Sequence, residues 1–114
     1  MTQEPTELRN YDFIQVIEAE QVPLGERVVF EIDGLPIAVF NVSGQYYAIG
    51  DVCTHDNGPL AEGELVGYQI ICPRHGARFD IRNGKALTLP AFVDTPWYPA
   101  RVVDGWVEVG LPVE

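Results

Sequence analysis

A chain of 114 residues with 46% hydrophobic and 21% charged residues fits one globular domain with its own hydrophobic core. Seventeen acidic against seven basic residues give a formal net charge of −10, which argues against nucleic acid and anionic membranes as partners. No apolar run approaches the roughly 18 residues that span a bilayer, and the N-terminus lacks the pattern of a secretory signal. We therefore expect a cytoplasmic protein without a membrane segment.

Short strands are expected along the first half of the chain. Residues 1–10 are polar and are expected to be frayed. An apolar-rich run predicts a strand over 12–17, followed by a single helical turn over 18–21. Alternating apolar and polar residues over 27–33 are typical of a half-buried strand, and 37–42 and 45–49 predict two more. Three strands at this short spacing indicate an antiparallel meander.

The second half continues the pattern after an interruption near residue 53. Strands are predicted over 65–71 and 77–82, with a return strand over 85–89 after the turn residues Asn83-Gly84. Residues 90–96 form a proline-containing loop, and strands over 97–103 and 106–109 flank Asp104-Gly105, a strong hairpin signal. No stretch shows a convincing helical period. The sequence therefore predicts an all-β protein of about nine or ten short strands.

The interrupting segment contains every cysteine and every histidine of the chain: Cys53, His55, Cys72 and His75. Cys53 and His55 are two residues apart, so they point the same way in extended backbone. Cys72 and His75 are three apart around Pro73, which is compatible with a tight turn. Two Cys/His pairs on two loops indicate a metal site.

Three kinds of site are compatible with these residues. A disulfide would leave both histidines unused and is rare in the cytosol. A single structural zinc remains an alternative, but zinc modules usually pair thiolates with thiolates and histidines with histidines along the chain. Here each loop supplies one of each. That order favours two metal positions, as in a [2Fe–2S] cluster with two cysteines on one iron and two histidines on the other.

The motif itself resembles the Rieske motif. Cys53-Thr54-His55 is followed by sixteen residues and then by Cys72-Pro73-Arg74-His75-Gly76, and the flanking strands resemble a small Rieske ferredoxin over nearly the whole chain. The resemblance implies a single Rieske domain, an antiparallel β-sandwich or barrel with a base over about 11–49 and 86–114. It implies a cluster-binding subdomain over about 50–85. It further implies one Rieske [2Fe–2S] cluster, with Cys53 and Cys72 on one iron and His55 and His75 on the other.

The same resemblance implies a soluble, monomeric one-electron carrier rather than an enzyme. Such proteins pass electrons from a flavin-dependent reductase to a terminal ring-hydroxylating oxygenase. A catalytic oxygenase would need a further iron held by two histidines and a carboxylate, and both histidines are already used. Two alternatives stay open: a small redox subunit of another enzyme, as in some nitrite reductases, or a protein associated with iron–sulfur assembly.

Departures from the wider family predict the behaviour of the site. Rieske proteins of cytochrome bc complexes carry a disulfide between the loops, where this chain has Gly58 and Arg74. They also donate hydrogen bonds from a serine and a tyrosine hydroxyl, where this chain has Ala77 and Phe79. Fewer hydrogen bonds predict a low reduction potential. Residues 51–85 carry a net charge of −1 and the remainder −9, which suits a partly apolar, transient contact near the histidines.

Overall fold

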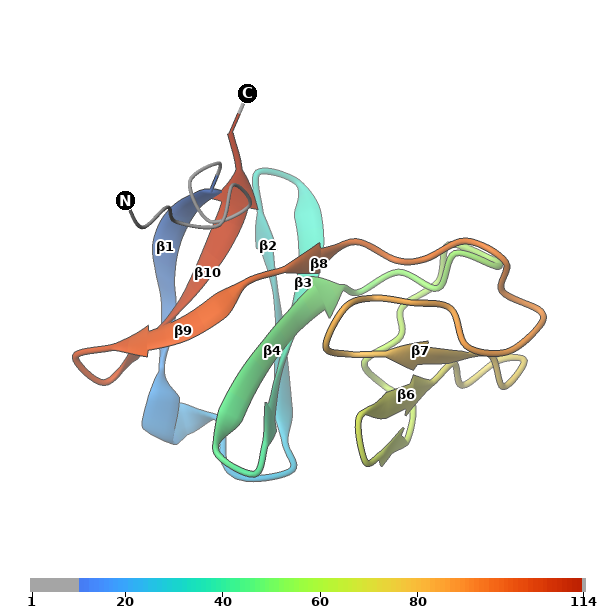
Figure 1. The fold of residues 1–114 in the computed structure, drawn as a ribbon, viewed down its shortest axis with the longest axis horizontal. Coiled ribbons are helices and arrows are strands. Elements are labelled where there is room, and N and C mark those ends of the chain that lie inside the picture. The colour runs from blue at the N-terminus through green and yellow to red at the C-terminus, as the bar shows by residue number, and fades with distance from the viewer. Residues whose placement is uncertain (1–10, 114) are drawn as a thin grey trace, which may run out of the picture.

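The computed structural model describes residues 11–113, which form three antiparallel sheets (Figure 1). The sheet orders are β1-β10-β9, β2-β3-β4-β8 and β5-β6-β7. The strands, in chain order, are β1 (Tyr11–Glu18), β2 (Arg27–Ile32), β3 (Leu35–Val42), β4 (Gln45–Gly50), β5 (Leu65–Val66), β6 (Gln69–Ile71), β7 (Arg78–Asp80), β8 (Trp97–Tyr98), β9 (Ala100–Val103) and β10 (Trp106–Pro112). The frayed segment expected over 1–10 lies outside the described residues, as does residue 114. Within the described range, no helix is long and apolar enough to cross a membrane.

The all-β fold class and the meander are confirmed. Strands β2, β3 and β4 pair in sequence order, with Val39 opposite Val28 on one side and Ala48 on the other. Their turns place Asp33, Gly34, Ser43 and Gly44 at positive φ, the geometry that tight hairpins require. The expected helical turn is a 3₁₀ turn, η1 (Ala19–Gln21).

Two predicted strands are each divided in the structure. The strand predicted over 97–103 is split at Pro99, which has no backbone N–H to donate. Strand β8 therefore pairs with β4, while β9 pairs with β10 in a different sheet. The strand predicted over 65–71 is a small hairpin of β5 and β6, because Gly67 adopts a φ of 60° between them.

The return strand predicted over 85–89 does not form. One isolated bridge, Phe79 to Ala86, represents it. Beyond the bridge the Thr88 hydroxyl accepts the Arg78 backbone N–H at 2.9 Å, where a regular ladder would use a backbone carbonyl. The segment between β7 and β8 is therefore a loop and not a strand (Figure 1).

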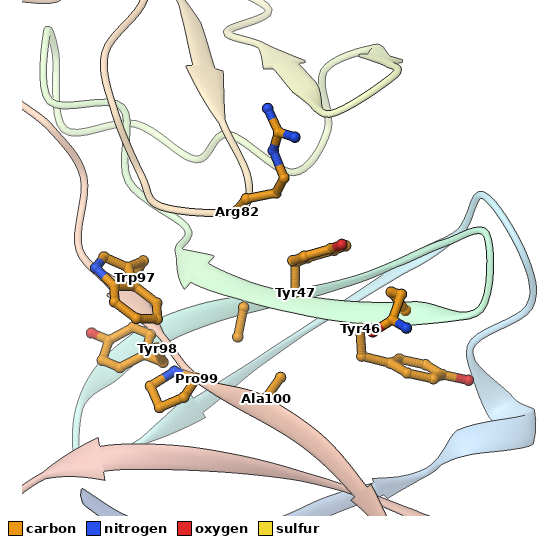
Figure 2. Close-up of a pocket in the computed structure, with 9 residues that line it drawn as sticks. Tyr46, Tyr47, Arg82, Trp97, Tyr98, Pro99 and Ala100 are labelled. Atoms are coloured by element: carbon orange, nitrogen blue, oxygen red, sulfur yellow. The ribbon is translucent and has the colours of Figure 1, made fainter. Parts of the chain in front are cut away.

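Strand β3 serves two hydrophobic cores at once. Ile37 and Val39 face the core between the first two sheets, whereas Ala38 and Phe40 face a second core shared with the third sheet. Strand β4 alternates in the same way. Figure 2 shows Tyr46 and Tyr47 on opposite sides of β4, with Arg82 on the side of Tyr47. The period-two geometry of these two strands therefore joins the sandwich to the third sheet.

Polar contacts reinforce this junction. Arg27 on β2 donates from Nη1 to the carbonyl oxygens of Ala61 and Gly63, both at 2.7 Å. Gly63 in turn lies against the backbone: a Cβ at that position would be 1.7 Å from the Ile71 carbonyl oxygen. The segment between the two loops is therefore held against β2 and β6 by contacts that leave no room for a side chain at Gly63.

Phe40→Ala should destabilise the whole protein, because Phe40 is fully buried and touches the core beneath the loops. We expect a loss of about 3–5 kcal/mol in the free energy of unfolding. Urea denaturation followed by circular dichroism and by tryptophan fluorescence should show a single shifted transition. Val29→Ala, at a position 46% exposed on β2, is the matched control. Two separate transitions, or a loss no larger than the control's, would show that the two cores are not coupled through β3.

Candidate metal centre

The two loops that carry the predicted ligands have the same backbone design. The Cys53 N–H donates to the Gly58 carbonyl and the Cys72 N–H donates to the Ala77 carbonyl, both at 2.7 Å. Each cysteine carbonyl also accepts an N–H four residues on, from Asn57 at 2.6 Å in the first loop and from Gly76 at 3.0 Å in the second. Asn57 and Gly76 both adopt positive φ, 64° and 79°. Each cysteine thus opens one tight turn.

The structure brings the two cysteines together in the interior. Cys53 is 0% exposed and Cys72 is 1% exposed, and both are free thiols. Their sulfur atoms and a carboxylate oxygen of Asp56 all lie within 4.8 Å of one another. Burial raises the pKa of the Cys53 thiol, although the His55 backbone N–H acts in the opposite direction. The disulfide alternative is not what this structure contains.

The two histidines form a second pair, at the surface. Both residues are exposed, the side chain of His75 to 56%. The ring centroids of His55 and His75 are 4.9 Å apart, with ring planes at 86°. The predicted ligands therefore form two pairs on the two loops, a buried thiol pair and an exposed imidazole pair. This donor set fits a two-iron cluster with different ligands on each iron better than one zinc ion with four equivalent positions.

Asp56 is the residue at this site that sequence reasoning missed. Its carboxylate accepts two hydrogen bonds from Arg74, Nε to Oδ2 at 2.6 Å and Nη2 to Oδ1 at 3.1 Å. Arg74, and next the Gly58 N–H, hold the pKa of Asp56 at about 2. The signal was present in the sequence, because an acid follows His55 and a base precedes His75. It could have been found by asking which charges adjoin the ligands.

Two buried polar residues fix the first loop to the scaffold. Asp51 Oδ1 accepts the N–H groups of Leu60 and Ala61 at 2.8 and 2.7 Å. The buried Thr95 hydroxyl donates to the Val52 carbonyl oxygen at 3.0 Å. Both ends of the Cys53 turn are therefore held by side chains outside it. The Thr54 hydroxyl also donates to the Val93 carbonyl, which joins the turn to the segment after β7.

Comparison with known proteins places this geometry in context. Residues 12–99 match the family model of the Rieske [2Fe-2S] domain. The 3-phenylpropionate/cinnamic acid dioxygenase ferredoxin subunit of Escherichia coli K12 is 44% identical over 93 residues, covering 80% of this chain and 86% of that protein. The ferredoxin component of the naphthalene 1,2-dioxygenase/salicylate 5-hydroxylase systems of Ralstonia sp is 37% identical, covering 73% and 80%.

A solved structure has the same fold. That structure is the complex of reduced oxygenase and oxidized ferredoxin in carbazole 1,9a-dioxygenase. The matching chain superposes with a TM-score of 0.82 and 32% identity, covering 90% of this chain and 95% of its own length. The similarity therefore extends well beyond the segment that holds the cysteines and histidines.

Asp51→Ala should loosen the first loop, because it leaves two backbone N–H groups at a buried position without an acceptor. We expect a loss of about 1–3 kcal/mol in the free energy of unfolding of the metal-free protein. Asp51→Asn keeps an acceptor oxygen and should cost less. Urea denaturation measures both variants, and equal stability of wild type and Asp51→Ala would refute the role given to this carboxylate.

Proposed function

The chain belongs to the Rieske [2Fe-2S] domain family, and we propose that it is the one-electron carrier of a ring-hydroxylating dioxygenase system. The single observation that carries the proposal is the pairing of two buried thiols with two exposed imidazoles. We assign Cys53 and Cys72 to one iron and His55 and His75 to the other. When bound, the cluster supplies one centre that takes up and releases a single electron.

The cysteine turns and the two histidines have different roles at the centre. The buried cysteine turns keep water from the thiolate side, and their backbone hydrogen bonds fix where the sulfur atoms lie. The imidazoles of His55 and His75 are exposed, so they form the part of the ligand set that a partner can approach. Electron entry and exit at the histidines follow from this arrangement, because transfer is fastest where the least protein intervenes.

The chain acts as an electron-transfer component, not as a catalytic enzyme. Its relatives are ferredoxin subunits and components of dioxygenase systems. The sequence contains two histidines, and both belong to the proposed ligand set. No histidine is left to hold the mononuclear iron that an oxygenase uses for its chemistry.

The remaining parts of the proposal concern organisation and partners. The acceptor is a terminal oxygenase, in line with the carbazole 1,9a-dioxygenase complex of a similar ferredoxin. The donor is a flavin-dependent reductase, and the carrier works as a cytoplasmic monomer. We assign about residues 50–85 to its cluster-binding subdomain and about residues 11–49 and 86–114 to the base.

An apolar surface next to the histidines is suited to the acceptor. Four large apolar side chains of the loop between β7 and β8 are exposed, Leu87, Leu89, Phe92 and Val93, and so is Trp97 at the start of β8. Phe92 is 83% exposed and Val93 63%. The Thr54 hydroxyl bonds the Val93 carbonyl, so this segment adjoins the loop of His55. A large exposed aromatic side chain beside an electron exit is the kind of residue that anchors a transient contact.

The test of the proposed function is electron delivery by the purified protein. Iron-loaded protein should be red-brown, accept one electron per chain from a flavin-dependent reductase, and return it on mixing with an oxidised ring-hydroxylating oxygenase. Stopped-flow absorbance follows both steps. A colourless protein with one zinc per chain, or a reduced carrier that no oxygenase of this class reoxidises, would overturn the proposal.

Phe92→Ser should slow transfer to the oxygenase without changing the cluster. Loss of a central aromatic anchor predicts a fall in second-order rate constant of about 5- to 30-fold. Glu31→Gln, an exposed acid on β2, is the matched control and should leave the rate nearly unchanged. Stopped-flow mixing of each reduced variant with the oxygenase gives the rates. Equal changes of the transfer rate in the two variants would show that the oxygenase does not contact the surface around Phe92.

The reduction potential should lie toward the low end of the Rieske range of roughly −150 to +300 mV, and below about +100 mV. Ala77 and Phe79 are both fully buried and carry no hydroxyl that could donate a hydrogen bond to the centre. Ala77→Ser adds such a donor and should raise the potential, whereas Ala100→Ser, on β9, should not. Protein-film voltammetry measures all three proteins. A wild-type midpoint above about +100 mV would contradict this account.

A further inference from the structure

A bidentate ion pair joins the two ligand loops at their tips, beside the ring contact of His55 with His75. Within the described residues, backbone hydrogen bonds hold each cysteine turn to itself and not to the other turn. Apart from the two thiols themselves, the side-chain hydrogen bonds between the turns are the two that Arg74 donates to Asp56. Asp56 directly follows His55 and Arg74 directly precedes His75. The pair thus connects the chain beside one imidazole to the chain beside the other.

The geometry of this pair depends on Gly58. The guanidinium lies so close to the backbone of the first turn that a Cβ on Gly58 would be 2.5 Å from Arg74 Cζ. The Gly58 N–H also donates to Asp56 Oδ1 at 3.0 Å. Gly58 therefore leaves room for the guanidinium and orients the carboxylate that receives it. Its own φ is not in the positive region, so alanine would be acceptable to the backbone there.

We propose that the ion pair of Asp56 and Arg74, here called the clasp, positions the two ligand loops at the separation the cluster requires. Gly58 leaves the space that the guanidinium of the clasp occupies. The proposal rests on the ligand set of the proposed function. A bidentate Arg–carboxylate pair fixes relative orientation as well as distance, which a single hydrogen bond does not. Exposed ion pairs add little to global stability, so the effect of this one falls on the ligand loops and not on the fold. We assign both residues a positioning role, although the Asp56 carboxylate itself lies 3.8 Å from His75 Nδ1.

The positive charge of Arg74 and the negative charge of Asp56 also cancel each other beside the centre. Removing one of the two charges should therefore shift the reduction potential in a direction that depends on which charge remains. Asp56→Asn leaves a positive guanidinium and should raise the reduction potential, while Arg74→Gln leaves a carboxylate and should lower it. Both variants open the clasp, so both should shorten the lifetime of the bound cluster. Gly58→Ala changes no charge and should shorten the lifetime with little change in potential.

The experiment measures cluster loss and potential on the same iron-loaded proteins. Decay of the visible absorbance in excess chelator should be about two- to fivefold faster in Asp56→Asn, Arg74→Gln and Gly58→Ala than in wild type. Arg74→Lys should be intermediate, because an ammonium cannot make the bidentate contact. Arg101→Gln is the matched control: it breaks the exposed Arg101–Glu108 pair, 2.8 Å on the first sheet, and should decay like wild type.

The outcomes separate this proposal from the function on which it rests. Wild-type decay rates in the three clasp variants would overturn the clasp, even with shifted potentials, because the pair would then act by charge alone. A wild-type protein that binds no cluster would overturn the proposed function instead. Should Asp56→Asn or Arg74→Gln yield no loaded protein, Arg74→Lys and Gly58→Ala keep both charges and decide the question by the same decay rates.

Discussion

The burial of two free thiols side by side is the constraint on which the rest of this structure depends. Cys53 and Cys72 come from loops far apart in the chain, yet both are almost fully enclosed. Thiolates in such a place are costly unless a cation stabilises them. The surrounding core, the two matched turns and the side chains that fix their ends all serve to bring the sulfur atoms together. The imidazoles, one turn further out, are left at the surface.

Strands β3 and β4 belong to both hydrophobic cores and therefore fix the ligand loops rigidly to the rest of the protein. Because β3 and β4 present alternate side chains to two cores, the sandwich and the third sheet cannot move independently without exposing Ile37, Phe40 or Ile49. A carrier benefits from such stiffness, since transfer of an electron is slowed by every atom that must move with it. The exposed apolar segment around Phe92 is the surface that we propose for transient docking of the acceptor.

Local patterns predicted most of the fold. The alternation in β2 and the turn residues after it specify the meander, and the order of Cys53, His55, Cys72 and His75 favours a site with two metal positions. The strand predicted over 65–71 fails for a local reason, the turn at Gly67, whereas the other failures depend on which partner a strand finds. Pro99 sends β8 and β9 to different sheets, and the Thr88 hydroxyl replaces a strand partner for Arg78. The Asp56–Arg74 contact is only half visible in the sequence: each charge adjoins a predicted ligand, but the two residues are eighteen apart and meet only when both turns have formed.

The ligand assignment can be tested most directly by spectroscopy of protein grown with ⁵⁷Fe and ¹⁵N-histidine. Mössbauer spectra of the oxidised protein should show two iron sites with different parameters. After one-electron reduction, one iron should become ferrous, and electron–nuclear double resonance should detect two imidazole nitrogens coupled to it. Two equivalent irons without nitrogen coupling, or a single zinc in place of iron, would contradict the assignment of the thiols to one metal and the imidazoles to the other.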